Sequence, residues 1–136
     1  MKTFKLYLKK LLTYSGTIEN EVTKANYHFK GNFYSTHTEL LNIIKNGSRV
    51  LDIGCYDSSV AEMLMNKKNC IVDGIDEKKI SNNLKLNKFF EHNLNKGPLE
   101  LGIDYSNYDY IIMLDVIEHL DNPENFIKKL KILLEN

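Results

Sequence analysis

The chain has 136 residues, with 18 basic side chains balanced by 18 acidic ones, so its formal net charge at neutral pH is zero. This length suits one ordinary domain with a single core. Balanced charge gives no overall attraction to nucleic acid or to an anionic membrane. No apolar run approaches the ~18 residues that a membrane span requires. Lysines interrupt the first apolar stretch, which excludes a secretory signal. We therefore expect a cytoplasmic protein whose two cysteines are free thiols.

Residues 1–34 are predicted to precede the core. Phe4, Leu8, Leu11 and Leu12 recur at helical spacing, which predicts an amphipathic helix over 3–13. Such a helix packs on the domain or, because its other face is basic, lies on a membrane or a partner. The following residues to 34 have no clean period and can fold over a site as a lid.

Residues 35–136 alternate between strand and helix patterns, which predicts a three-layer α/β sandwich with a parallel sheet. Thr36 and Ser59 each begin a capping box with a glutamate three residues later, and Asp121-Asn122-Pro123-Glu124 is a third helix start. The first helix closes at Asn46-Gly47, and a weak helix is expected around Ile80 and Leu84. The predicted strands are 49–53, 69–76, 88–93 and 108–114, and the other predicted helices cover 58–67 and 123–134.

Two carboxylates stand at the predicted tips of neighbouring strands. Asp52 lies where the first strand leaves the sheet, just before Gly54, whose lack of a side chain permits close backbone approach or positive φ. Asp76 ends the next strand, where its paired oxygens can accept both hydroxyls of a ribose. Backbone N–H groups and a helix N-terminus at the same edge suit polar or anionic cofactor groups. The pattern indicates a nucleoside-containing cofactor.

Three stretches carry a resemblance to a known family. Residues 50–55, Val-Leu-Asp-Ile-Gly-Cys, match the first motif of class I S-adenosylmethionine-dependent methyltransferases, V-L-D-x-G-C-x-x-G. Residues 72–76 resemble the second motif, and residues 108–123, with their Asp-Val-Ile-Glu-His-Leu turn, closely resemble the motif of the fourth core strand. The resemblance implies a Rossmann-like fold with strand order 3-2-1-4, S-adenosylmethionine as cofactor and an unidentified methyl acceptor.

The resemblance also implies roles for individual residues. Gly54, Cys55 and the loop through Tyr56 and Ser58 would face the methionine part of the cofactor, and Asp76 its ribose. The remaining cofactor contacts would come from Asp52 near the loop, from Asn93 and Leu94 at the adenine, and from Leu114 and Asp115 on the methyl-donor side. Upstream aromatic or polar residues over the cofactor would correspond to Tyr27, Tyr34 and His37.

The chain departs from the family in the loop after the first motif. Tyr56-Asp57-Ser58 stands where the family has small residues and a closing glycine. Tyrosine adds bulk where the backbone should approach the ligand, and Asp57 brings a negative charge near the donor's carboxylate. Both changes would weaken cofactor binding.

A second departure concerns the far side of the sheet. The family sheet continues with a further helix and about three strands, which the chain does not contain, so the sequence looks truncated after the helix over 123–134. An apolar fourth strand is a poor sheet edge because its free backbone groups invite pairing. We expect this strand to be covered by a second copy of the chain, by the N-terminal segment or by another polypeptide.

His119 is the candidate catalytic residue, because a histidine in this turn of the family can act as a base toward an acceptor hydroxyl. The alternative is that Glu118 and His119 brace the start of the following helix. Asp115, Glu118 and His119 also have a spacing that suits a divalent metal, but no second histidine completes such a site. Positioning alone can provide much of the catalysis, since the sulfonium donor is already activated.

The leading hypothesis is a methyltransferase or its cofactor-binding domain. The alternative is a catalytically inactive methyltransferase-like module for interaction or regulation, which the altered loop and the missing sheet half favour. A nicotinamide dehydrogenase is less compatible with the sequence, because no G-x-G-x-x-G follows the first strand.

Overall fold

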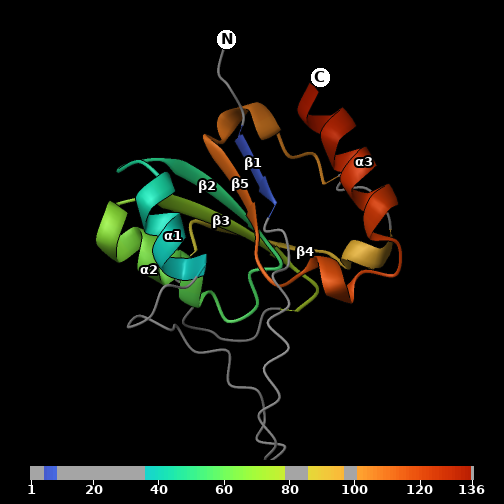
Figure 1. The fold of residues 1–136 in the computed structure, drawn as a ribbon, viewed down its shortest axis with the longest axis horizontal. Coiled ribbons are helices and arrows are strands. Elements are labelled where there is room, and N and C mark those ends of the chain that lie inside the picture. The colour runs from blue at the N-terminus through green and yellow to red at the C-terminus, as the bar shows by residue number, and fades with distance from the viewer. Residues whose placement is uncertain (1–4, 9–35, 79–85, 97–100, 136) are drawn as a thin grey trace, which may run out of the picture.

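The computed structural model describes residues 5–8, 36–78, 86–96 and 101–135. Five parallel strands form one sheet in the order β1-β5-β2-β3-β4 (Figure 1). The strands are β1 (Lys5–Leu8), β2 (Arg49–Ile53), β3 (Ile71–Asp76), β4 (Lys88–Glu91) and β5 (Tyr110–Met113). The four strands from β2 onward have the order predicted from the sequence, 3-2-1-4, so the predicted Rossmann-like sheet is confirmed.

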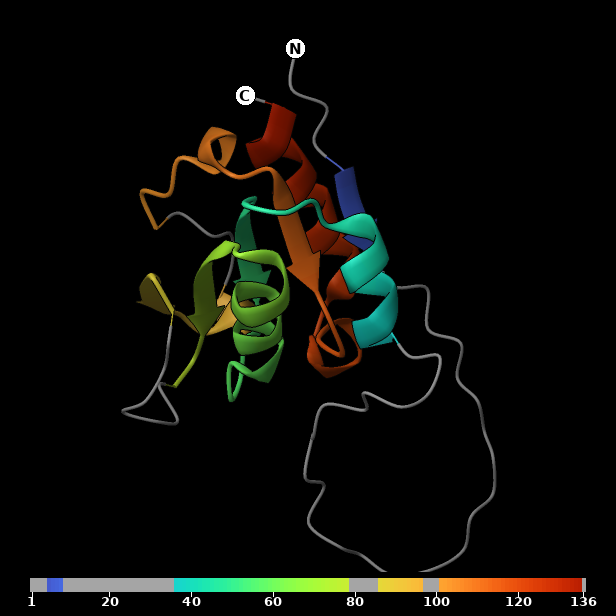
Figure 2. The same ribbon diagram turned by 90° about the vertical axis from the view of Figure 1, so that its left-hand side faces the viewer.

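Helices cover both faces of this sheet. Helices α1 (Thr36–Ile43) and α2 (Ser59–Lys68) lie on one face and α3 (Pro123–Glu135) lies on the other, as the two perpendicular views show (Figures 1 and 2). Strand side chains alternate between the two faces, so Val50 packs with the cluster beneath α1 and α2, while Leu51 packs with the cluster beneath α3. The sheet therefore lies between two helical layers, in agreement with the predicted three-layer α/β sandwich.

The prediction of a helix over 3–13 is wrong for residues 5–8. These residues form β1, which pairs in parallel with β5 from Lys5 opposite Tyr110 to Leu8 opposite Met113. The spacing of four apolar residues indicated a helix, but the unpaired backbone groups at the edge of β5 favour a strand there. The N-terminal segment therefore covers the fourth core strand, which was one of the three covers expected.

The start of α2 differs from the predicted capping box. Ser59 does not cap the helix: its own N–H donates to Asp57 Oδ1 at 3.0 Å. Ser58 is the N-cap residue, has a left-handed φ of 61° and makes no side-chain cap hydrogen bond. Asp57 can take this role because a short carboxylate readily accepts an N–H two residues later.

The start of α3 and the turn after α1 agree with the sequence, whereas α1 begins at Thr36 itself, so the capping box predicted there stays a prediction. Asn122 Oδ1 accepts the N–H of Asn125 at 3.0 Å, so a side-chain cap begins α3 as predicted. Gly47 follows α1 with a φ of 73°, the left-handed geometry expected for it. The proposed lid over 14–34, with Tyr27 and Tyr34, and the weak helix around Ile80 and Leu84 lie outside the described residues.

Among the described residues, no helix is long and apolar enough to cross a bilayer.

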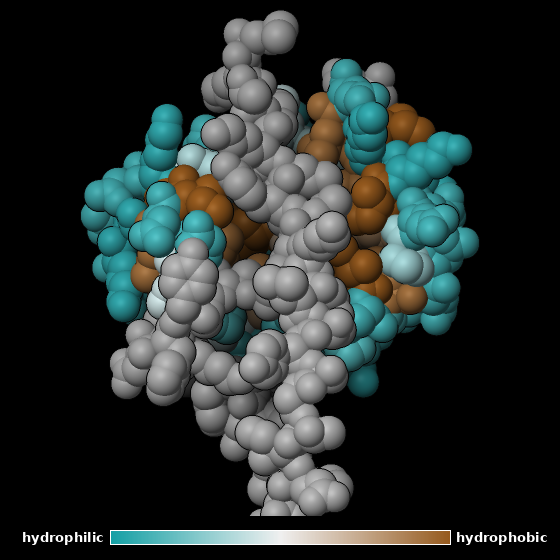
Figure 3. All heavy atoms as spheres, in the orientation of Figure 1, coloured by the Kyte–Doolittle hydropathy of each residue, from teal (hydrophilic) through white to brown (hydrophobic). Residues whose placement is uncertain are grey.

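Apolar surface is visible in Figure 3 on the side where α3 lies. Ile132 of this helix is 51% exposed, and Leu133 and Leu134 are partly buried against the core.

Candidate functional site

The loops that follow β2, β3, β4 and β5 meet at one edge of the sheet, because the strands are parallel and end together. The loop after β2 carries Gly54 to Ser58, and the loop after β5 carries Leu114 to His119. Asp76 ends β3, and Asn93 follows β4. The structure therefore places these residues together at the end of the sheet where the strands terminate.

The backbone N–H groups of the first loop are directed into the protein. Gly54 and Cys55 both donate to the carbonyl of Ile75, at 2.7 and 3.2 Å, and Tyr56 donates to Asp76 Oδ2 at 2.9 Å. The N–H of Ser58 donates to the carbonyl of Cys55 at 2.7 Å. The expectation that these N–H groups face a ligand is therefore not met at residues 54–56 and 58.

Gly54 allows the loops after β2 and β5 to pack together. A Cβ at this position would lie 2.3 Å from Val116 Cγ2, and the φ of 78° is itself unfavourable for other residues. The positive φ that was one of the two reasons expected for this glycine is present, and the space that a Cβ would need is taken by a side chain of the protein. Gly74 acts similarly, since its Cβ would lie 2.6 Å from Cys55 Sγ.

Asp52 is buried at the base of this edge, with only 2% of its surface exposed. Burial raises the pKa of Asp52 to about 7, and the nearby charges of Asp76 and Asp57 add to the rise. Burial also raises the pKa of Cys55 to about 12, with contributions from Asp52 and Asp76, so its thiol stays protonated.

Ser58 offers a second buried polar group in the same loop. The residue is 5% exposed, and its Oγ has no hydrogen-bond partner among the described residues. Tyr56, by contrast, is 49% exposed and has a φ of 41°. The tyrosine ring is therefore at the surface and does not fill the core beneath the loop.

Asp76 and Asn93 both form hydrogen bonds within the protein. Asp76 accepts N–H groups at both oxygens, from Tyr56 at Oδ2 and from Glu77 at Oδ1, at 2.9 and 2.8 Å. Asn93 donates to Glu77 Oε2 at 3.3 Å and accepts the N–H of Asn95 at 2.9 Å. Each accepting oxygen keeps a second lone pair that a ligand can use.

The residues after β5 have different environments. Leu114 is partly buried on the α1 and α2 face, and Asp115 is exposed with a φ of 51°. His119 is exposed in the short 3-10 helix η3 (Ile117–His119). Neither Glu118 nor His119 forms a side-chain hydrogen bond or ion pair with the described residues, so the bracing role is not seen there.

Two further candidates lie near this edge. Leu94 lies in the 3-10 helix η1 (Leu94–Lys96) and packs partly buried against the α3-side core. His37 is partly exposed in α1. In the described part of the chain, no three acids, histidines or cysteines come together in an arrangement that could hold a metal.

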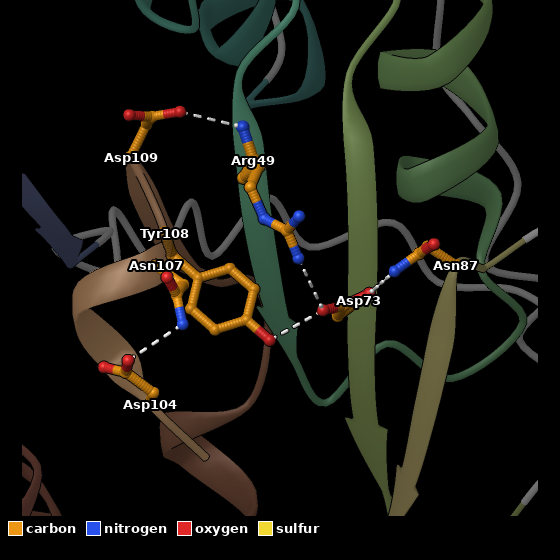
Figure 4. Close-up of polar contacts among 7 residues, drawn as sticks. All are labelled: Arg49, Asp73, Asn87, Asp104, Asn107, Tyr108 and Asp109. Carbon is orange, nitrogen blue, oxygen red and sulfur yellow. Dashed lines mark hydrogen bonds and ion pairs between the residues drawn. The ribbon is translucent and has the colours of Figure 1, made fainter.

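Sequence reasoning missed a polar network on the α3 side of the sheet, centred on Asp73 (Figure 4). Asp73 is 1% exposed and accepts hydrogen bonds from Tyr108 Oη and Asn87 Nδ2, each at 2.7 Å. Arg49 lies 3.8 Å away through its terminal nitrogen. The available signal was a charged residue inside an apolar strand, which is rarely buried unless it is paired.

The same network joins the start of β2 to the segment before β5. The Arg49 N–H donates to Asp109 Oδ2 at 2.9 Å, and the Asp109 N–H donates back to the Arg49 carbonyl at 2.8 Å (Figure 4). Burial and the hydrogen bond to Asp73 raise the pKa of Tyr108, so its hydroxyl remains a donor. This network lies away from the loops that follow the strands. Its role is therefore to stabilise the sheet rather than to bind a ligand at those loops.

Comparison with known proteins is consistent with this arrangement. A family model described as a methyltransferase domain matches residues 27–136. The protein named probable (S)-tetrahydroprotoberberine N-methyltransferase 2 of Papaver bracteatum is 36% identical to the chain, in an alignment that covers 64% of the chain and 26% of that relative. The (S)-tetrahydroprotoberberine N-methyltransferase of Eschscholzia californica is 34% identical, with coverages of 64% and 27%. The chain thus aligns with about a quarter of the length of these two curated relatives.

Proposed function

The chain belongs to the methyltransferase domain family, and from this premise we propose that it binds S-adenosylmethionine at the edge described above and transfers its methyl group to an acceptor. The observation that carries the proposal is a pair of buried polar side chains, Asp52 and Ser58, at this edge. Asp52 is 2% exposed and has a raised pKa, and the buried Ser58 Oγ has no hydrogen-bond partner among the described residues. Buried polar groups are normally satisfied, so these two suit a polar, cationic ligand.

Each site residue has a proposed task. Asp52 accepts a hydrogen bond from the cofactor's ammonium group, and Ser58 bonds its methionine part. Asp76 uses the remaining lone pairs of its carboxylate for the ribose hydroxyls, while Asn93 and Leu94 hold the adenine. The residues of the first loop through Cys55 and Tyr56, and of the β5 loop at Leu114 and Asp115, enclose the donor.

The cofactor supplies an activated methyl group on a positively charged sulfur. The protein's contribution is then to hold an acceptor in line with this group and to exclude water, which alone can account for a large rate gain. His119 is the proposed base for an acceptor proton because it is exposed at the end of the same loop. Nitrogen acceptors are the first to test, since both curated relatives are named N-methyltransferases.

A calorimetric titration of the full chain with S-adenosylmethionine and its demethylated product tests the proposal. We expect saturable binding of the cofactor, which Asp76→Ala weakens by at least tenfold because two ribose hydrogen bonds are lost. The matched control is Asp104→Ala. The Asp104 carboxylate accepts the Ser106 N–H and lies in the segment that leads into β5, away from the loops that follow the strands. Absence of binding by both ligands at millimolar concentration would contradict the proposal.

An inactive interaction module is the second candidate. It is favoured by the inward hydrogen bonds of Gly54, Cys55 and Tyr56, which leave those N–H groups unavailable to a ligand. Radiolabelled methyl transfer to a panel of amines and phenols separates the two candidates. Cofactor binding without turnover of any acceptor would favour the second one.

A further inference from the structure

Hydrogen bonds connect the loops after β2, β3 and β4 in an unbroken series. Tyr56, in the first of these loops, donates its N–H to Asp76 Oδ2 at 2.9 Å, and Glu77 donates its N–H to the other oxygen of Asp76 at 2.8 Å. The Glu77 carboxylate in turn accepts Asn93 Nδ2, from the loop after β4, at 3.3 Å. The residues proposed for the ribose and the adenine, Asp76 and Asn93, therefore belong to one series of bonds.

Asn95 extends this series to the loop after β5. Its N–H donates to Asn93 Oδ1 at 2.9 Å, in the turn that an asparagine forms with the residue two positions later. The side-chain oxygen of Asn95 then accepts the N–H of Asp121, 26 residues further along the chain, at 2.9 Å. Asp121 comes just before α3, so η1 lies beside the start of that helix (Figure 1). The Asn95 amide thus joins the loops that follow β4 and β5.

The loop after β5 is held on both sides of His119. On one side Val116 occupies the space beside Gly54, in the loop after β2. On the other side Asp121 bonds to Asn95. His119 lies between these two points in η3, and its N–H donates to the Val116 carbonyl at 3.0 Å. The position of His119 therefore depends on both contacts, of which the second belongs to the series that includes Asp76 and Asn93.

We propose that Asn95 is a positioning residue that links the nucleoside part of the cofactor to the loop that carries His119. This inference rests on the proposed function, because that proposal assigns Asp76 to the ribose and Asn93 to the adenine. A nucleoside bonded to these two residues restrains the start of the series, and Asn95 transmits the restraint to Asp121. Binding of the donor thereby orders the acceptor side of the site.

The setting of these bonds determines the size of the effect. Asn95 and Asp121 are both exposed, so water competes for the hydrogen bond between them. One net hydrogen bond of this kind changes a local opening equilibrium about three- to tenfold. We therefore expect Asn95 to control the opening of η3 and not the stability of the whole fold.

Hydrogen exchange of the His119 and Leu120 amides, followed by NMR on the full chain, tests the inference. These amides donate within the η3 turn at 3.0 and 3.2 Å, so their exchange requires the turn to open. The probe is S-adenosylhomocysteine, saturating as judged by calorimetry. We expect it to slow both amides about three- to tenfold in the unmodified chain and to leave them unchanged in Asn95→Ala. Asn95→Asp keeps an oxygen for the Asp121 N–H and should restore the slowing.

The matched control is Asn107→Ala. Asn107 is also an exposed asparagine of a short 3-10 helix, η2 (Tyr105–Asn107), and its side chain donates to Asp104 Oδ2 at 2.9 Å. This variant should show the same slowing as the unmodified chain, and its loss there would overturn the role of Asn95. If circular dichroism shows that Asn95→Ala does not fold, Asn95→Leu, which has nearly the same shape but no polar side-chain atom, takes its place.

The remaining outcomes separate the two proposals. Binding of S-adenosylhomocysteine without slowing of the two amides in the unmodified chain overturns the inference and leaves the proposed function standing. Equal slowing in Asn95→Ala, or no recovery in Asn95→Asp, has the same meaning. Binding of neither S-adenosylhomocysteine nor S-adenosylmethionine to the unmodified chain overturns both proposals.

Discussion

Gly54 combines two constraints that can be separated by mutation. Its positive φ disfavours any side chain, and a Cβ would also collide with Val116. Gly47 has a similar φ of 73° but nothing within 4 Å of its Cβ position, so it carries the first constraint alone. Comparing substitutions at Gly54 and Gly47 thus separates the effect of backbone strain from the effect of steric overlap with Val116.

We predict that Gly54→Ala lowers the free energy of unfolding by roughly 2–4 kcal/mol and Gly47→Ala by about 1 kcal/mol. Urea denaturation followed by circular dichroism measures both. The difference should shrink when Val116→Ala is added to each variant, because the overlap is then removed. Equal effects of the two glycine substitutions would contradict the role of Val116.

Asp52 makes the stability of the fold depend on pH. Its pKa is about 7 in the folded chain and near 3.8 when unfolded, so the unfolded state releases its proton more readily. The stability that the protonated form provides is complete below about pH 4 and is lost as the pH rises through 7. Ionisation of the buried Asp52 carboxyl therefore lowers the free energy of unfolding as the pH rises through 7.

Asp52→Asn should therefore stabilise the chain at pH 8, by an amount of the order of 3 kcal/mol, and should have little effect at pH 4. Thermal melts at both pH values provide the measurement, with Asp121→Asn, an exposed carboxylate, as the control. The same variant should bind S-adenosylmethionine more weakly. A loss of stability at pH 8 would show that Asp52 has a stabilising partner in the fold.

At the scale of the elements, the buried network around Asp73 joins β3 to the starts of β2 and β4 and to the segment before β5. Tyr108→Phe would remove a 2.7 Å donor to a buried carboxylate, which should cost roughly 1.5–3 kcal/mol of unfolding free energy. Tyr110→Phe is the comparison, since its hydroxyl donates to the Ile43 carbonyl at 3.3 Å and should cost less. Chemical denaturation that ranks Tyr110→Phe as the more damaging change would argue against the importance of the network.

The core strands and helices could be predicted because their sequence patterns agree with their final environments. Ile111-Ile112-Met113 is an unbroken apolar run, and all three residues are buried as a central strand requires. In β1 the local pattern and the final structure conflict. Its helical spacing reflects only nearby residues, whereas its strand conformation depends on pairing with β5 at the other end of the chain.

The candidate site could be predicted by position but not by orientation. The sequence places Asp52, Gly54 and Asp76 at strand ends, and the structure confirms that placement. It does not reveal that the N–H groups of the loop donate to Ile75 and Asp76, since hydrogen-bond direction depends on backbone angles. The positive φ of Tyr56 and Ser58, unusual for such residues, was equally inaccessible from residue types.

At the scale of the whole molecule, β1 protects the edge of β5. We predict that introducing Leu6→Pro and Tyr7→Pro together will uncover this edge, because proline cannot donate to the ladder. The expected result is a concentration-dependent shift to larger species in size-exclusion chromatography with light scattering, compared with the unmodified chain. As a control, two prolines at the exposed positions 128 and 131 would disrupt α3 without affecting the pairing of β1 with β5. The same shift to larger species in this control would refute the specific role of β1.

The pairing of Lys5 with Tyr110 also has a consequence for the order of folding. β2 and β3 are joined through α2 by a short crossover, so they can pair early, whereas β1 must wait until β5 has been synthesised. Closing so long a loop makes this contact slow relative to the local ones. The strand that is synthesised before the other four is therefore the last to join the sheet, and until it pairs the nascent chain presents the open apolar edge of β5 to chaperones and to its neighbours.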